Sequence, residues 1–212
     1  MEKRAFDSFA FDEIERLFGI KRLQNLEALT SWTNVKQPIP KKIEEQLEML
    51  QKSLLKFIYA WNEDELKLFF IGPLLVQAEL YGENFKPFTQ RNLKATFPTQ
   101  NLEVQGKVEF MLARGITTPS APLFFLHEYK QERRRETDPL AQVLIAMLAA
   151  RQYNKHDHAD YGCYVIGRYW FFVVFNGTEY AVSRSYDATQ PDLFTIFNAI
   201  CEIKNIAKKV FV

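Results

Sequence analysis

The end of one apolar stretch carries residues whose types and spacing suit metal-dependent chemistry. Glu128 and Lys130 follow the apolar run Leu123–Leu126, which reads as a strand covered on both faces. Because side chains alternate along a strand, Glu128 and Lys130 project from the same face, about 6–7 Å apart. Buried Glu and Lys are rare unless they are paired or bind a metal. This strand end is therefore a candidate functional site, with a solvated ion pair at an edge as the alternative.

A second acid lies in the preceding candidate strand, 102–112, which a loop of small residues over 115–121 separates from the first run. If the two strands are antiparallel neighbours, the carboxylates of Glu109 and Glu128 can face each other. Two convergent carboxylates form a hard oxygen site that suits Mg²⁺ or Mn²⁺. A lysine beside them can orient the attacking water and neutralise charge that grows on a phosphate. The sequence therefore predicts a divalent-metal site with Lys130 next to it.

The helix that follows contains one unexpected polar residue. Asp138-Pro139 is a strong helix start, with an N-cap residue before a proline, and predicts a helix to about Tyr153. Between Pro139 and Ala150 the only polar side chain is Gln142. A helix that is apolar all round is buried, so this amide needs a hydrogen-bond partner. Gln142 either supports the cluster at the end of the preceding strand or bonds a loop carbonyl.

Together these three pieces resemble the PD-(D/E)xK, or restriction-endonuclease-like, nuclease superfamily. They are an acid on one strand (Val108-Glu109), the E-x-K strand (Glu128-Tyr129-Lys130) and the helix that carries Gln142. Elements over roughly 70–205 also follow the family's order. Glu109 and Val108 stand where the usual motif has Asp and Pro. A catalytically inactive nuclease-like binding or regulatory module is therefore the alternative to an enzyme.

The resemblance implies a fold, an activity and a set of site residues. The fold is a restriction-endonuclease-like α/β core, in which helices flank a central mixed sheet of four strands. The activity is Mg²⁺-dependent phosphodiester hydrolysis of nucleic acid, with DNA preferred over RNA. The implied metal ligands are Glu109, Glu128, the backbone carbonyl of Tyr129 and, from the helix before the sheet, Glu79, while Lys130 positions the water and Gln142 supports the site.

Composition is consistent with one folded domain. The chain has 212 residues, of which 47% are hydrophobic and 25% are charged, as in ordinary globular proteins. Residues 1–82 read as a mainly helical N-terminal portion and 83–212 as the core that contains the sheet. Helices are expected over 5–23, 41–58, 62–79 (with a kink at Gly72-Pro73) and 192–208. Asn176-Gly177 predicts a type I′ hairpin, and Gly167-Arg168 a second tight turn.

Charge and targeting signals limit the classes of partner that the sequence allows. The net charge is only +1, whereas dedicated nucleic-acid binders are usually strongly basic. This balance favours the inactive module, or a helix-rich interaction protein, over a nuclease. The run 131–136 reads as a phosphate-contacting patch or a solvated loop. The sequence shows no signal peptide, no membrane span and only two cysteines, so the chain is expected to be cytoplasmic and away from membranes. A homodimer is left open.

Overall fold

A computed structural model describes residues 1–130, 138–154 and 158–211 of the chain. The described residues form an α/β structure with a mixed nine-stranded sheet, larger than the four-stranded core that the resemblance implies. The strands are β1 (Glu2–Ala5), β2 (Lys21–Leu23), β3 (Lys86–Phe97), β4 (Leu102–Arg114), β5 (Ser120–Lys130), β6 (Asp160–Ile166), β7 (Tyr169–Asn176), β8 (Glu179–Val182) and β9 (Tyr186–Asp187). Their order is β1-β4-β5-β6-β7-β8-β2, with β3 paired to β4 and β9 to β7.

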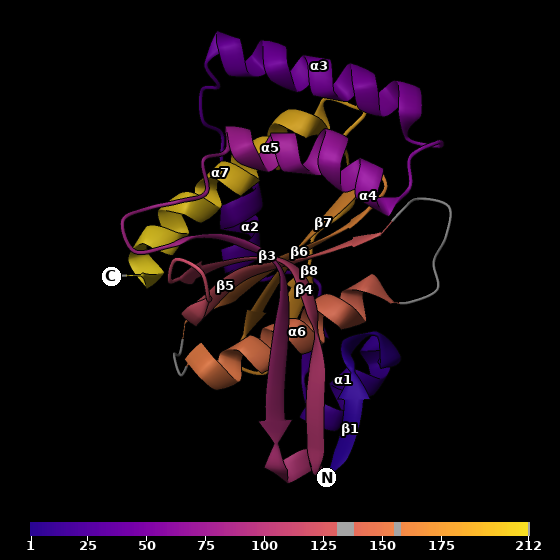
Figure 1. Cartoon of the computed structure of the whole chain (residues 1–212), viewed down its shortest axis with the longest axis vertical. Coiled ribbons are helices and arrows are strands. Elements are labelled where there is room, and N and C mark those ends of the chain that lie inside the picture. The colour runs from indigo at the N-terminus through magenta and orange to yellow at the C-terminus, as the bar shows by residue number, and fades with distance from the viewer. Residues whose placement is uncertain (131–137, 155–157, 212) are drawn as a thin grey trace.

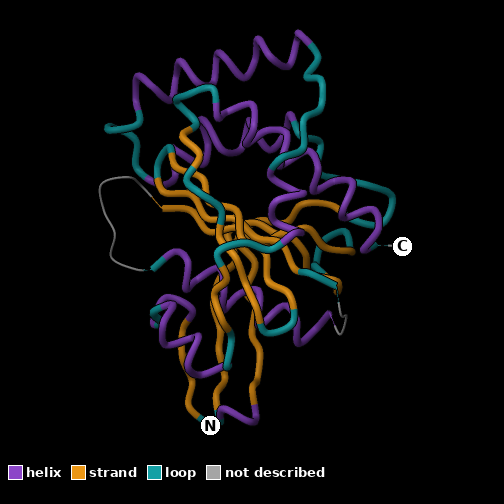
Figure 2. Tube along the Cα trace, turned by 180° about the vertical axis from the view of Figure 1, so that it is seen from behind, coloured by secondary structure: helices purple, strands orange, loops and turns teal. Residues whose placement is uncertain are grey.

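Helices cover both faces of this sheet (Figures 1 and 2). They are α1 (Phe11–Phe18), α2 (Glu27–Thr33), α3 (Lys41–Phe57), α4 (Glu63–Leu66), α5 (Gly72–Gln77), α6 (Pro139–Asn154) and α7 (Asp192–Val210), with short segments η1 (Phe6–Ser8), η2 (Lys67–Ile71) and η3 (Pro98–Gln100). One apolar cluster joins α2–α5 and α7 to the sheet, and a second joins η1, α1 and α6 to it. Apolar residues on two faces of one sheet thus fix a three-layer arrangement.

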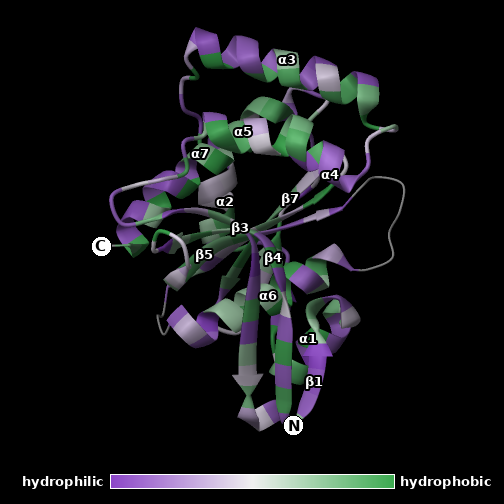
Figure 3. Cartoon of the chain, in the orientation of Figure 1, coloured by the Kyte–Doolittle hydropathy of each residue, from purple (hydrophilic) through white to green (hydrophobic). Residues whose placement is uncertain are grey.

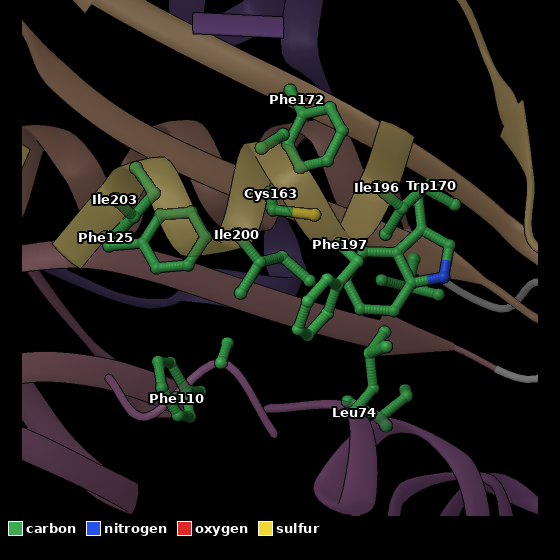
Figure 4. Packing of buried hydrophobic residues seen from close by; sticks show 14 of the residues in the cluster. Leu74, Phe110, Phe125, Cys163, Trp170, Phe172, Ile196, Phe197, Ile200 and Ile203 are labelled. Atoms are coloured by element: carbon green, nitrogen blue, oxygen red, sulfur yellow. The ribbon is translucent and has the colours of Figure 1, made fainter. Parts of the chain in front are cut away.

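The first cluster holds α5 and α7 against the strands. Figure 4 shows Leu74 of α5 and Phe197 of α7 near Trp170 of β7. All three side chains are buried. On α3 the two buried leucines, Leu47 and Leu54, are seven residues apart, and hydrophilic residues occupy much of the rest of the helix (Figure 3). This packing holds the segment from α3 to α5 over the sheet, next to the end of β5.

The N-terminal portion is less helical than its sequence predicts. The single helix expected over 5–23 is wrong, because only Phe11–Phe18 is α-helical and two short strands flank it. β1 pairs in parallel with β4, and β2 pairs in parallel with β8, so both strands extend the sheet. Their partners lie far away along the chain, and local periodicity carries no signal for such pairings.

The helix predicted over 62–79 is present as three continuous segments, α4, η2 and α5. Asn62 and Glu65 form the expected capping box, with reciprocal hydrogen bonds of 2.9 and 2.8 Å. The predicted break at Gly72-Pro73 coincides with the end of the π-helical η2, where an extra residue per turn lets the chain pass a proline without a gap in the helix.

Of the two predicted tight turns, one is confirmed and one is shifted by a residue. Gly167-Arg168 connects β6 to β7 as a two-residue loop. In the β7–β8 hairpin Asn176 pairs with Glu179, so the loop is Gly177-Thr178 and the Asn-Gly type I′ prediction is wrong. Only Gly177 has a positive φ there, as in a type II′ turn with glycine at its first position. No helix among the described residues is long and apolar enough to cross a membrane.

Candidate functional site

The register of β4 and β5 brings the two predicted acids together. Phe110 pairs with His127, and the same antiparallel register places Glu109 directly opposite Glu128. Residues opposite each other on antiparallel strands have their side chains on the same side, about 5 Å apart at Cβ. The first geometric expectation from the sequence, two strands that present facing carboxylates, therefore agrees with the structure.

An irregularity in β5 sets this register. Leu112 pairs with Phe124, and the register shifts before the next pair, Phe110 with His127. Phe125 lies at the shift with a φ of 52°, and its side chain enters the same apolar cluster as its neighbour Phe124. Without the extra residue, continuation of the Leu112–Phe124 pairing would put His127 opposite Glu109. The β-bulge thus aligns the two carboxylates, as bulges beside functional sites often re-aim side chains.

A third acid and a second lysine come from α4 and η2, not from the sheet. The Nζ atom of Lys67 lies 2.8 Å from Glu63 and 3.0 Å from Glu109. The Nζ atom of Lys130 lies 2.7 Å from Glu128 and 3.9 Å from Glu63. Glu63 therefore connects the two lysines, and the five side chains form one network across α4, η2, β4 and β5. Figure 1 shows α4 beside the end of β5. We call these five residues the charged cluster.

Burial and the lysines set the protonation of the cluster. Only 9% of the Glu128 side chain is exposed, and this burial raises its pKa to about 7, although Lys130 acts in the opposite direction. Burial disfavours the charged form of Lys130, but Glu128, Glu63 and Glu109 outweigh it and raise the pKa of Lys130. Burial also acts to lower the pKa of Lys67, but Glu63 and Glu109 outweigh it and raise this pKa well above its ordinary value. Both lysines are therefore cations at neutral pH and serve as hydrogen-bond donors, not as bases.

Gln90 on β3 completes the surroundings of Glu109. The ladder pairs Thr89 with Phe110 and Arg91 with Val108 but skips Gln90 and Glu109. Gln90 has a φ of 55°, which is uncommon for a residue other than glycine, and its amide nitrogen donates a hydrogen bond to Glu109. Backbone outliers of this kind often occur at functional sites, because the surrounding structure has to maintain them.

A cavity of about 580 Å³ lies beside the charged cluster, within the range of small-molecule sites. α4, η2 and α5 form one side of it, and β3, β4 and β5 form the other. The lining residues are Glu63, Asp64, Lys67, Leu68, Ile71, Gly72, Leu75, Thr89, Gln90, Glu109, Phe110 and Tyr129. Glu63, Lys67 and Glu109 belong both to the cavity and to the charged cluster, so a ligand in the cavity would touch the cluster.

The remaining predicted site residues have different positions. Glu79 follows α5 and pairs with Lys204 of α7 at 3.4 Å. It lies sixteen residues beyond Glu63, about 24 Å at the usual helical rise, so the helix acid at the cluster is Glu63 instead. Tyr129 lines the cavity, and its hydroxyl contacts Nδ1 of His127 at 2.8 Å. Gln142 is in the first turn of α6 and partly buried, and its supporting role stays a prediction. The run 131–136 lies outside the described residues.

Sequence reasoning missed Glu63, Lys67 and Gln90. For the first two a signal was present: the capping box fixes a helix start at Asn62, and Glu63 and Lys67 have the i, i+4 spacing of a helical ion pair. Glu63, in the first turn of that helix, is therefore a better candidate for the acid that assists metal binding than Glu79 at its end. For Gln90 the sequence contains no signal, because its role depends on a distortion of β3.

The carboxylates of the cluster are chemically suitable ligands for a hard divalent cation, but their present arrangement does not suit one. Carboxylate oxygens are the ligands that Mg²⁺ prefers, and Glu63, Glu109 and Glu128 supply them. Among the described residues, however, no group of three or more His, Cys, Asp or Glu side chains is placed to hold a metal ion. Lys67 and Lys130 lie between the carboxylates instead. A metal would therefore have to displace at least one ammonium group.

A search of protein-family models and a search of curated proteins found no match to this chain. Assignment of the site therefore depends on its residues and their geometry.

Proposed function

We propose that the charged cluster is the active site of a Mg²⁺- or Mn²⁺-dependent nuclease of the restriction-endonuclease-like type. The observation that carries the proposal is the placement of Glu109 opposite Glu128, with Lys130 in contact with Glu128 at 2.7 Å. An acid, an E-x-K strand and a helix acid thus meet at one end of β5. Nucleic acid, DNA in preference to RNA, is the proposed substrate, and its phosphodiester bond is hydrolysed.

Each residue has a proposed role. Glu109, Glu128 and Glu63 would hold the divalent cation, which when bound supplies Lewis-acid stabilisation and an activated water. Lys130, a cation at neutral pH, donates a hydrogen bond that orients the water and stabilises charge on the phosphate. Lys67 presents a second ammonium group at the cavity side of the cluster. Gln90 holds Glu109 in place through its amide.

One observation favours a second candidate function, a catalytically inactive nuclease-like binding or regulatory module. The Nζ atom of Lys67 contacts Glu63, Glu109 and, at 3.5 Å, Asp64, so an ammonium group already lies where these carboxylates meet. In a non-catalytic module these contacts would be permanent, and divalent cations would not bind.

The experiment that separates the two candidates is a cleavage assay with matched variants. Purified protein is incubated with plasmid and with single-stranded DNA, with Mg²⁺, with Mn²⁺ or with EDTA. We expect metal-dependent cleavage that falls at least a hundredfold in Glu109→Gln and Lys130→Ala. Glu103→Gln, on the same strand as Glu109 but paired with Lys94 and Lys3, should cleave normally.

Two outcomes contradict the nuclease proposal. Cleavage that survives in both Glu109→Gln and Lys130→Ala would place the activity elsewhere. If no cleavage occurs with either metal and Mn²⁺ titration detects no binding, the second candidate is favoured over the nuclease.

A further inference from the structure

The cavity next to the charged cluster has two chemically different halves. Its apolar wall consists of Leu68, Ile71 and Leu75, which follow one helical face at i, i+3 and i+7, together with Phe110 of β4. Its polar part consists of Thr89, Gln90 and the acids and lysine of the cluster. A ligand that fills this cavity must therefore combine an apolar surface with a polar edge and a charged group.

The apolar wall is open to solvent at one end only, because Ile71 and Phe110 belong to the buried core. Leu68 is 67% exposed, and Leu75 is only partly buried. Gly72 lies between them on the same face and carries no side chain, which leaves room above the helix. The exposed end of the wall, at Leu68, is the part that the apolar face of a ligand can reach.

We infer that this cavity binds an unpaired base of a single-stranded nucleic acid, whose phosphate takes the place of the Glu63 and Glu109 carboxylates at Lys67. A nucleobase has two apolar faces and a hydrogen-bonding edge, which match the leucine and isoleucine side chains and the polar groups of Gln90 and Thr89. Enzymes that hold extruded bases use stacking between apolar or aromatic side chains together with hydrogen bonds to the base edge. This inference rests on the proposed function and adds to it that the substrate is single-stranded.

The charge of the chain is consistent with this kind of substrate. A net charge of +1 gives little of the general attraction on which binding to duplex phosphates depends. Contacts to the base itself would then have to supply part of the affinity, as base stacking does in single-strand binding proteins in addition to a charged groove. A base inside a duplex cannot reach the apolar wall, because it is stacked between its neighbours.

The test uses a pair of substitutions at adjacent positions of α5. Leu75→Trp fills the cavity, whereas Val76→Trp places the same side chain outside it, at a position that is 72% exposed. The probe is a twelve-nucleotide single strand with 2-aminopurine at its centre, and its duplex form is the comparison. Fluorescence reports whether the modified base leaves the stack. Affinity is measured in EDTA and, with Glu109→Gln, in Mg²⁺.

We expect the wild type to bind the single strand at least tenfold more tightly than the duplex. Leu75→Trp should lose at least tenfold of this affinity, and Val76→Trp should keep it. Should Leu75→Trp fail to fold, Leu68→Glu and Val76→Glu make the same comparison at two exposed positions. Equal binding by the two members of a pair, or no preference for single strands, overturns the inference.

The two proposals fail in different ways. If wild type cleaves duplex and single strand equally well and Leu75→Trp retains binding, the nuclease proposal stands and the base pocket is wrong. If the single strand binds with the expected dependence on Leu75 and nothing is cleaved with any metal, the base pocket stands and the nuclease proposal is wrong.

Discussion

Replacement of Glu128 by glutamine should change how the stability of the protein depends on pH. Glu128 is buried beside Lys130, and burial raises its pKa from 4.5 to about 7 in the folded protein. The folded state therefore binds this proton more tightly than the unfolded state does. Stability from the protonated side chain is fully present below pH 4.5 and is lost as the pH rises through 7. Glutamine has the same shape and no proton to lose.

The shift corresponds to about 3 kcal/mol, at about 1.4 kcal/mol per pKa unit. About 1 kcal/mol of this change falls between pH 6 and pH 8, because most of it occurs below the folded pKa. Over that interval the free energy of unfolding of the wild type, relative to Glu128→Gln, should fall by about 1 kcal/mol. For a chain of this length such a change moves the midpoint of thermal unfolding by about 2–4 °C.

Urea unfolding of both proteins at pH 6, 7 and 8 measures the effect. The difference between the two proteins isolates Glu128, because other groups with shifted pKa values, such as Asp160, are common to both. Glu48→Gln, on the exposed side of α3, makes the same charge change and should run parallel to the wild type. A difference between wild type and Glu128→Gln that is the same at pH 6 and pH 8 would refute the burial argument.

Three further predictions test separate parts of the structure. Lys67→Met removes the ammonium group that is the closest partner of the Glu63 carboxylate. Mn²⁺ affinity, measured by electron paramagnetic resonance titration, should therefore rise roughly tenfold. Weaker binding would show that the lysine assists the metal. Gly106→Ala should lower the free energy of unfolding in urea by about 1–3 kcal/mol, because a Cβ atom there would overlap the ring of Phe6. An unchanged midpoint would mean that the ring moves away at no cost. Asn62→Ala removes the helix cap and should cost about 1 kcal/mol in the same assay, and a cost near zero would mean that packing alone holds α4.

Much of the candidate site could be predicted from local sequence. Strand alternation placed Glu128 and Lys130 on one side of β5, and their 2.7 Å contact agrees with that expectation. The loop of small residues implied an antiparallel partner, and Glu109 does lie on it. These inferences depend only on a period of two and a short connection, both of which can be read from the sequence.

The parts that could not be predicted depend on distant or distorted pairings. The bulge at Phe125 decides whether Glu109 faces Glu128 or His127, yet phenylalanine gives no sign of a positive φ. β1 and β2 are short and rich in charged residues, and only their pairing with β4 and β8 makes them strands. In each case the deciding partner lies outside the window that a local pattern covers.

The balance of the charged cluster limits how any ligand can enter it. Both ammonium groups are already engaged, Lys67 by Glu63 and Glu109, and Lys130 by Glu128. A phosphate that binds here competes with those carboxylates for the same N–H donors. A cation that binds here competes with the lysines for the same oxygens. Each ligand releases the group that the other needs, so the network favours joint binding of a cation and a phosphate over binding of either one alone.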